Sequence, residues 1–238
     1  MKNRLDKELV KRGLVITRSQ AESLVKLGKV KLNGKEVLKA GAMVGTGDSL
    51  QLAQMDQYVS RAGLKLASVA DKLELDFRDK VVLDVGSSTG GFTDYALQHG
   101  AKKVIAVDVG SDQLHPSLHN NEKIELHEKT DIRSLVSLSE SPDIILIDVS
   151  FISLRDILPT VYKLATKHTQ IVPMVKPQFE AGAKDINKGV VKNDAIRRQI
   201  FKNFEIWAKQ KFLILNKADS EVAGAKGNRE RFYLLKKI

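Results

Sequence analysis

A glycine-rich segment near residue 90 has the residue types needed to hold a small polar ligand. Asp84 lies in the apolar run 81–85, and the segment 86–92 that follows reads Gly-Ser-Ser-Thr-Gly-Gly-Phe. Glycine lets a backbone turn sharply and approach a ligand closely. A dinucleotide site of the G-x-G-x-x-G type fits poorly, because Ser88 stands at the middle glycine and the last two glycines are adjacent. The segment therefore predicts a cofactor loop of another kind.

Two further acids follow the next apolar runs. Asp108 lies 22 residues after Gly86, a spacing that suits a carboxylate gripping ribose hydroxyl groups. Asp131 follows the third run. Taken singly, such an acid is more often a loop cap, but acids at successive strand ends together predict cofactor binding. The residues predicted to contact a cofactor are Asp84, Gly86, Ser87, Ser88, Gly90, Gly91, Phe92, Asp108, Val109, Asp131 and Asp148.

Four charged residues stand at the ends of predicted elements. Asp148 closes the fourth apolar run, and Lys176 closes the fifth, immediately before Pro177. Lys65 lies in a predicted helix before the first run, and Glu230 precedes the last run. Ligands of open α/β sheets bind outside the carboxyl ends of the strands, so Asp148 and Lys176 are well placed for chemistry. A lone lysine more often packs its stem and reaches water, so the prediction depends on the four together.

Alternating strand and helix signals place these residues on one α/β domain. Continuous Val/Ile/Leu strands separated by helices predict a mostly parallel sheet covered on both faces, of Rossmann-like type. The predicted strands cover 81–85, 103–109, 124–127, 143–148, 170–175, 212–215 and 231–235, and the predicted helices cover 60–73, 153–167 and 193–209, with another ending near residue 97.

The first 54 residues predict a separate small basic domain. They carry eleven Lys and Arg against five Asp and Glu, which accounts for +6 of the chain's net charge of +10. Helices are expected over 4–12, with Leu5 and Val10 facing inward, and after Thr17, which can cap the second helix. The pair Asn33-Gly34 predicts a tight hairpin turn, and 44–52 a further strand. Residues 55–59 are the expected linker.

The small domain resembles the RNA-binding domain named after ribosomal small-subunit protein four. The residues that carry the resemblance are Arg4-Leu5-Asp6, Leu9-Val10, Gly13-Leu14, Thr17-Arg18, Ala21, Leu24-Val25, Gly28-Lys29-Val30, Asn33-Gly34 and Gly47-Asp48. The resemblance implies RNA binding through phosphates, which carries little sequence information and depends steeply on salt. The cations expected to contact RNA are Arg4, Lys11, Arg12, Arg18, Lys26, Lys29 and, beyond the domain, Arg61.

The larger domain resembles the FtsJ-like ribose methyltransferases, in its glycine loop, in the order Lys…Asp…Lys…Glu, and in the Lys-Pro-Gln-Phe-Glu segment 176–180. With the basic domain, the whole chain is similar to the TlyA (haemolysin A) family of ribosomal RNA 2′-O-methyltransferases. The resemblance implies an α/β methyltransferase domain that uses S-adenosylmethionine, a small α+β RNA-binding domain, and cytidine ribose in ribosomal RNA or ribosomal subunits as substrate. Its catalytic residues carry over to Lys65, Asp148, Lys176 and Glu230, with Lys176 acting on the 2′-oxygen either as a base or electrostatically.

Composition excludes other classes. Cysteine is absent, which removes disulfides and thiolate chemistry, and the five histidines show no metal-ligand spacing, so no metal is expected. No apolar run approaches a membrane span and no secretory signal is visible, so a cytoplasmic protein is expected. Lys184 and Lys188 either meet RNA phosphates or lie on a surface connection. Two alternatives stay open, an RNA-binding protein without catalysis and, less favoured, a membrane-active haemolysin.

Overall fold

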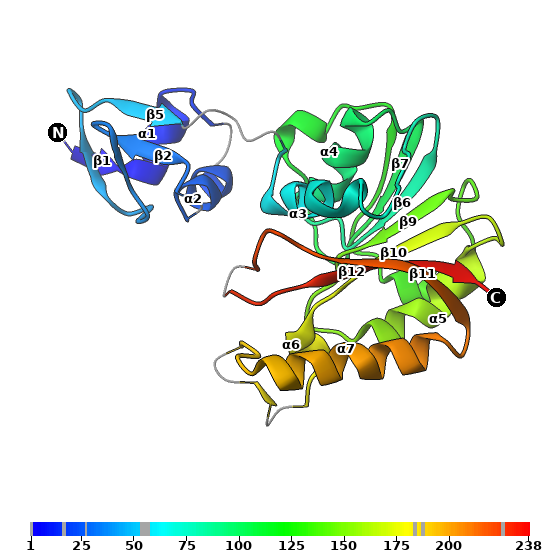
Figure 1. Ribbon diagram of the computed structural model, residues 1–238. Helices are drawn as coiled ribbons and strands as arrows, with labels where there is room; N and C mark the ends of the chain where they lie inside the picture. Colours follow the sequence, from blue (N-terminus) through cyan, green and yellow to red (C-terminus); the bar gives the residue numbers. More distant parts are fainter. Residues whose placement is uncertain are drawn as a thin grey trace. The chain divides into compact units, whose positions relative to one another are not determined.

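The computed structural model describes residues 2–15, 18–26, 28–52, 58–182, 185–186, 189–224 and 227–238. The chain divides into two compact units, Met1–Asp56 and Gln57–Ile238, each described here by itself (Figure 1). Thr17, Lys184 and Lys188 lie outside the described residues, and so does the side chain of Lys26.

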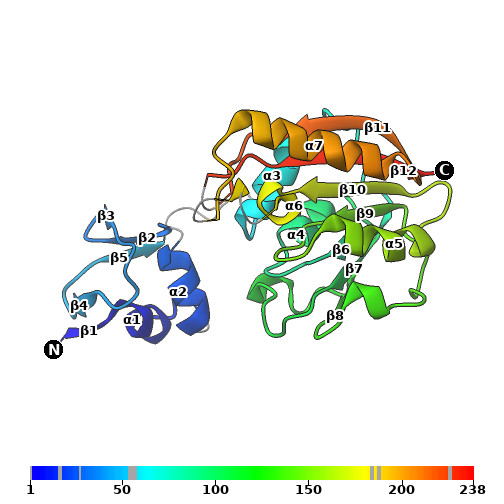
Figure 2. The same cartoon turned by 90° about the horizontal axis from the view of Figure 1, so that it is seen from below.

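The N-terminal unit packs two helices against two small antiparallel sheets (Figure 2). Strand β1 pairs with β4, and β2 pairs with β3 and β5. Its elements are β1 (Lys2–Arg4), α1 (Leu5–Lys11), α2 (Arg18–Lys26), β2 (Val30–Leu32), β3 (Lys35–Glu36), β4 (Met43–Gly45) and β5 (Leu50–Leu52). Its core consists of Leu5, Leu9, Val15, Ala21, Val25, Val30 and Val44.

Two local predictions for this unit meet different outcomes. The hairpin turn is confirmed, because Asn33 and Gly34 have φ values of 51° and 79°. The single strand over 44–52 is wrong. The Gly45 N–H donates to the Asp48 carboxylate at 2.7 Å, and this turn sends β4 and β5 into different sheets. The stretch 45–49, which reads Gly-Thr-Gly-Asp-Ser, is typical of a turn, and the prediction of a single strand ignored it.

The second unit is built on a seven-stranded sheet in the order β11-β12-β10-β9-β6-β7-β8, in which β12 runs opposite to the other six strands. All seven predicted strands are present, and β11 continues beyond its predicted end. The elements are α3 (Arg61–Ala70), β6 (Val81–Val85), α4 (Gly91–Gln98), β7 (Lys103–Val107), η1 (Pro116–Leu118), β8 (Ile124–His127), η2 (Ile132–Ser134), β9 (Ile144–Ile147), α5 (Leu154–Leu164), β10 (Gln170–Val175), α6 (Pro177–Glu180), α7 (Asp194–Ala208), β11 (Phe212–Asp219) and β12 (Arg231–Lys237).

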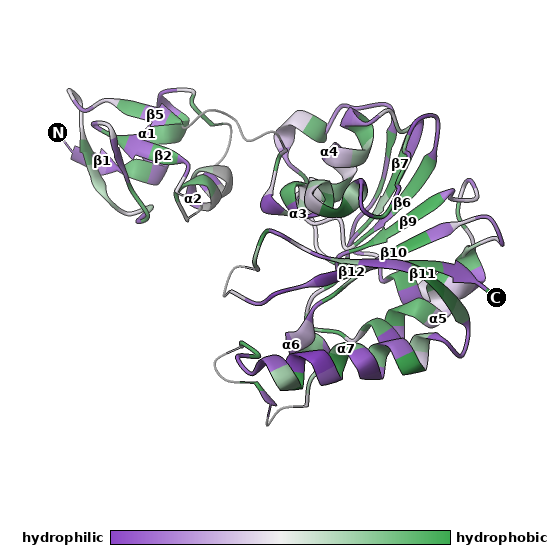
Figure 3. Ribbon diagram, in the orientation of Figure 1, coloured by the Kyte–Doolittle hydropathy of each residue, from purple (hydrophilic) through white to green (hydrophobic). Residues whose placement is uncertain are grey.

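Helices cover both faces of this sheet (Figures 1 and 2). Val81, Leu83 and Val85 of β6 pack with α5 and α7, whereas Val82 packs with α3 and α4. Because both faces of the sheet are buried, the central strands are apolar along most of their length (Figure 3). Helix α7 covers one face only, and polar and apolar residues alternate along it (Figure 3). This packing fixes the strand ends, at which the predicted site residues lie.

Candidate active site

The site begins where three neighbouring parallel strands end. Gly86 follows β6, Asp148 follows β9 and Lys176 follows β10, and these strands are adjacent in the order β10-β9-β6. The Asp148 N–H donates to the Val85 carbonyl at 2.9 Å, which holds the first two ends together. The sheet topology therefore brings residues 90 positions apart in the chain to one edge.

Two buried ion pairs connect the four charged residues. The Lys176 Nζ lies 2.5 Å from Asp148 Oδ1, and the Lys65 Nζ lies 2.5 Å from Glu230 Oε2. Both lysine side chains are only 10% exposed. Removing such charges from water is costly, so close pairing is needed to hold them there. Each pair joins distant parts of the sequence, and the four residues were predicted as a set but not as these two pairs.

Lys176 has two further neighbours. Its Nζ donates to Ser150 Oγ at 2.9 Å and lies 5.8 Å from the ring centroid of Phe179. Asp148 and Ser150 therefore hold the end of the Lys176 side chain in place beside the strand ends.

Helix α3, which carries Lys65, packs closely against the start of α4. A Cβ on Gly91 would lie 2.1 Å from Ser60 Oγ, and one on Gly63 would lie 2.5 Å from the Cβ of Tyr58. Ser60 also caps α3 by accepting from the Ala62 N–H. Gly91 of the glycine-rich segment therefore serves helix packing.

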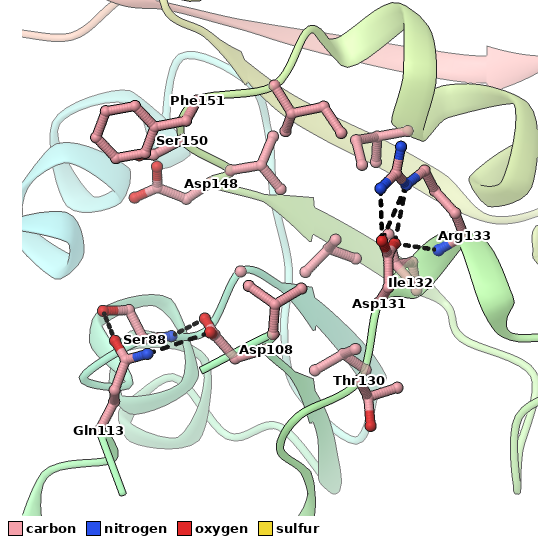
Figure 4. A pocket seen from close by; sticks show the side chains of 17 residues that line it. Ser88, Asp108, Gln113, Thr130, Asp131, Ile132, Arg133, Asp148, Ser150 and Phe151 are labelled. Atoms are coloured by element: carbon pink, nitrogen blue, oxygen red, sulfur yellow. Dashed lines mark hydrogen bonds and ion pairs between the residues drawn. The ribbon is translucent and has the colours of Figure 1, made fainter. Parts of the chain in front are cut away.

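Two cavities meet beside the Lys176–Asp148 pair. The larger, about 520 Å³, has Asp148 on its wall, and the smaller, about 460 Å³, has Lys176 on its wall. Ser150 and Phe151 line both cavities, and Figure 4 shows them on the wall of the larger one. The smaller cavity also contains both members of the second ion pair, Lys65 and Glu230. The arrangement provides two adjoining ligand spaces with charged groups at their junction.

Phe151 is a candidate functional residue that the sequence did not reveal. It has φ of 64°, in the left-handed region that a bulky side chain rarely adopts, and its side chain is 93% exposed. Its ring contacts that of Phe179, with centroids 5.2 Å apart. Backbone strain of this kind concentrates at functional sites. The available signal was an aromatic residue three positions after a strand-end acid.

The larger cavity is lined by six of the residues predicted to bind a cofactor: Gly86, Ser88, Asp108, Val109, Asp131 and Asp148. The Asp108 carboxylate accepts from the backbone N–H groups of Ser88 at 2.8 Å and Gly110 at 2.7 Å, and Gln113 closes this corner (Figure 4). A Cβ on Gly86 would lie 2.7 Å from the Asp148 carbonyl, so only glycine fits this floor.

Asp131 lies at the far end of the same cavity. It caps η2 and forms a bidentate ion pair with Arg133, with a shortest distance of 2.6 Å (Figure 4). The guanidinium group lowers the pKa of Asp131, so its carboxylate is charged at neutral pH. Arg133 was not anticipated from the sequence.

The other five predicted cofactor residues do not line either cavity. Phe92 packs in the core against Phe232, and a Cβ on Gly90 would collide with Leu114 and Leu118. Ser87 is buried at 5% exposure. These positions, with Gly91 and Asp84, hold the loop in place from behind.

Asp84 is fully buried at the base of the loop. Its Oδ2 accepts from the Thr93 backbone N–H at 3.0 Å and from the Thr93 hydroxyl at 2.7 Å. Burial raises the pKa of Asp84 to about 7. The residue ties β6 to the first turn of α4, and α4 in turn carries Gly91.

Several cations predicted to bind RNA have partners inside the N-terminal unit. The buried Asp6 accepts from Arg4 at 2.9 Å and Arg18 at 2.8 Å, and these arginine side chains remain 44% and 51% exposed. Arg12 donates to Glu8 and to the carbonyls of Asp48 and Gly45. Arg12 therefore fastens α1 to the turn between β4 and β5.

The remaining predicted RNA residues differ in exposure. Lys11 is 70% exposed, with a longer contact to Glu8 of 3.6 Å, and Lys29 is half-buried. In the second unit, Arg61 donates to the Ala223 carbonyl. Within the described residues, no three His, Cys, Asp or Glu side chains are grouped as metal ligands, and no helix has the length and hydropathy to cross a membrane.

Comparison with known families agrees with this architecture. Residues 58–237 match the FtsJ-like methyltransferase model and residues 3–50 match the S4 domain model. This chain belongs to the FtsJ-like methyltransferases. The methyltransferase domain thus follows an S4 domain, and the fold predicted from the sequence is confirmed.

Relatives align with both domains of this FtsJ-like methyltransferase. The 23S rRNA (cytidine-2′-O)-methyltransferase TlyA of Campylobacter jejuni is 40% identical, over 94% of this chain and 96% of its own length. Hemolysin A of Brachyspira hyodysenteriae is 38% identical, over 95% and 97%. A solved structure of a candidate hemolysin from Streptococcus thermophilus is 37% identical with a TM-score of 0.78, covering 99% of this chain and 88% of that chain.

Proposed function

We propose that this methyltransferase moves a methyl group from S-adenosylmethionine to a ribose 2′-hydroxyl of ribosomal RNA, with cytidine as the target nucleoside. The observation that carries the proposal is the pair of adjoining cavities with the Lys176–Asp148 ion pair at their junction. The names of the relatives support the same substrate class.

The larger cavity fits the cofactor. Its volume lies in the range of small-molecule sites, and Gly86 lets the backbone of its floor pack closely against Asp148. Asp108 would accept from ribose hydroxyls, Asp131 and Ile132 would face the base, and Asp148 would lie near the methionine portion. The bound cofactor supplies a methyl group activated by a sulfonium centre.

The smaller cavity would receive the target ribose. There the Lys176 Nζ, held by Asp148 and Ser150, either takes the 2′-hydroxyl proton or, as an ammonium, stabilises negative charge on the 2′-oxygen while that proton passes to water. Lys65 and Glu230 form the second pair on its wall and orient the nucleotide. The exposed ring of Phe151 offers a surface on which an unstacked base can lie.

The S4 domain would add affinity through phosphate contacts. The half-exposed arginines and the exposed Lys11 present positive charge, although Arg12 serves the domain's own structure. RNA affinity gained in this way falls steeply with salt concentration.

The decisive test incubates the protein with tritiated S-adenosylmethionine and, separately, with small subunits, large subunits, intact ribosomes and naked ribosomal RNA. We expect alkali-stable label at a ribose 2′-oxygen in one of these particles. Cofactor binding without labelling of any particle would contradict the proposal and favour an RNA-binding protein without catalysis.

A further inference from the structure

Glu180, the last residue of the Lys-Pro-Gln-Phe-Glu segment, has no role in the mechanism described so far. It ends α6, its side chain is 3% exposed, and it lines neither of the two cavities. Burial raises the pKa of Glu180, so holding its carboxylate here is unfavourable unless hydrogen bonds compensate. The burial of Glu180 at the end of this segment therefore needs an explanation.

The Glu180 carboxylate binds the start of helix α5. Its Oε1 accepts from the Leu154 backbone N–H at 2.7 Å, and its Oε2 accepts from the Ser153 hydroxyl at 2.7 Å. Ser153 is itself the N-cap of α5, with its hydroxyl accepting from the Arg155 N–H. Orphan N–H groups at a helix start are usually capped from within the same segment. Here a second cap arrives from α6, 26 residues later in the chain.

This bond joins the two segments that form the cavity junction. One segment, residues 148–153, carries Ser150 and Phe151, and the other, residues 176–180, carries Lys176 and Phe179. They also meet through the Lys176–Ser150 hydrogen bond and the contact between the two phenylalanine rings. Both of those contacts face the cavities, where ligands compete for the same groups. The Glu180 contacts lie behind them, away from the ligands.

The strained backbone at Phe151 needs such a restraint. A left-handed conformation at a bulky residue persists only where the surrounding structure enforces it. Two short hydrogen bonds at residues 153 and 154 fix the loop two residues after Phe151. Without them, the loop can relax and move Phe151 and Ser150 away from Lys176.

We propose that Glu180 is a positioning residue that clamps the 148–153 loop to the 176–180 segment and thereby holds Phe151 and Ser150 in register with Lys176. This inference rests on the proposed function, because its effect is read as methyl transfer to RNA. It explains why Glu180, which lines neither cavity, binds the opposite loop through its side chain.

The test compares Glu180→Ala with Glu180→Gln. The glutamine amide can still accept from the Leu154 N–H and can donate to the Ser153 hydroxyl, so it should retain transfer within about threefold, whereas alanine loses both bonds and should lower kcat/KM for RNA about thirtyfold. The cofactor Kd should change by less than about threefold in both, because Gly86, Asp108 and Asp131 lie on other elements. Arg155→Ala is the control, since Arg155 contacts Glu180 only at 3.9 Å and should leave transfer within about threefold.

A double-mutant cycle with Phe151→Ala separates positioning from general destabilisation. If Glu180 acts through the loop, Phe151→Ala should reduce transfer much less in the Glu180→Ala background than in the wild-type protein. Additive losses of activity in the double mutant would overturn the proposal, and so would equal losses in Glu180→Ala and Glu180→Gln. A loss of activity that is accounted for by a lower midpoint of unfolding in Glu180→Ala would overturn it too. Wild-type protein that transfers no methyl group would contradict the proposed function itself, whereas an active wild type with an equally active Glu180→Ala would contradict only the clamp.

Discussion

Asp6 in the S4 domain and Asp84 in the methyltransferase domain are both fully buried carboxylates, yet their surroundings move their pKa values in opposite directions. Hydrogen bonds from Arg4 and then Arg18 lower the pKa of Asp6. Thr93 donates two hydrogen bonds to the Asp84 carboxylate, and burial raises the pKa of Asp84 to about 7. Burial alone thus does not determine how an acid behaves.

The difference shows where each domain places its cations. In the S4 domain, arginines with half-exposed side chains neutralise buried acids and stabilise the fold. In the methyltransferase domain, Lys65 and Lys176 are nearly buried, are paired at 2.5 Å and line a cavity. Arginine suits the first arrangement because its planar fork binds two oxygens, whereas lysine provides a compact point charge for chemistry.

The largest expected effect tests the chemical side of this comparison. Lys176→Ala removes the cation nearest the cavity junction and should lower kcat for methyl transfer by about a thousandfold, with cofactor affinity within about threefold. Lys217→Ala is a matched control, because Lys217 pairs with Glu205 at 2.7 Å on the surface and should leave activity unchanged. Scintillation counting of labelled RNA and calorimetry of cofactor binding provide the two readouts. Near-wild-type turnover by Lys176→Ala would remove Lys176 from the mechanism.

Removal of residues 1–54 tests whether the S4 domain supplies RNA affinity. We expect ribosomal RNA binding to weaken about a hundredfold at 0.1 M salt, with a shallower salt dependence, because most phosphate contacts would be lost. Cofactor affinity should be unchanged. Fluorescence anisotropy with labelled RNA over a range of salt concentrations measures both quantities. Equal RNA affinity in the shortened protein would show that the cations of the methyltransferase domain suffice.

The two buried acids should give opposite pH dependences. Because the pKa of Asp84 is raised, the folded state binds its proton more tightly, and the free energy of unfolding should fall as pH rises from about 4 to about 7. Asp84→Asn should remove this decline, a change of a few kcal/mol. Because the pKa of Asp6 is lowered, its stabilisation is complete above about pH 4 and is lost as pH falls further, so Asp6→Asn should flatten the acid limb.

Urea denaturation over this pH range measures the free energy of unfolding for each variant. Hydrogen exchange assigns the changes to one domain or the other. A decline that persists between pH 4 and 7 in Asp84→Asn would show that another group carries it.

The smallest effect separates two neighbouring cations at the C-terminal end of α1, Lys11 and Arg12. Lys11→Gln should lower the slope of RNA affinity against salt by about 1 and leave the stability of the domain unchanged, because Lys11 is mostly exposed. Arg12→Gln should instead cost about 1–3 kcal/mol of stability, since it leaves the Gly45 and Asp48 carbonyls without their donor. If Arg12→Gln lowered the slope of RNA affinity against salt without lowering stability, Arg12 would be an RNA-contacting residue after all.

Prediction from the sequence succeeded wherever a local pattern carried the information. Apolar runs with a continuous Val/Ile/Leu composition located the strands, because a parallel sheet buries both faces of each strand. The Asn33-Gly34 turn was recognised because few residues adopt positive φ easily. Prediction from the sequence failed over 44–52. There the Asp48 carboxylate accepts from the Gly45 N–H and closes a turn between β4 and β5.

The site was harder to predict because its contacts are not local. Lys65 and Glu230 are 165 positions apart, and no pattern in the chain shows that they pair with each other. Arg12 and Lys11 have the same charge and adjacent positions, yet only the fold directs one to carbonyl groups and the other to solvent. Asp84 and Phe92 lie in the predicted cofactor loop but behind its surface.

The sequence by itself determined the two-domain order, the α/β class and the set of charged residues at the strand ends, since these follow from composition, hydrophobic periodicity and residue type. Only the tertiary structure decided which charges pair, that two cavities meet at Ser150 and Phe151, and that Glu180 binds the start of α5 from another segment. The reason is physical. Periodicity records which face of an element is buried, whereas pairing and strain arise only when elements far apart in the chain are packed together.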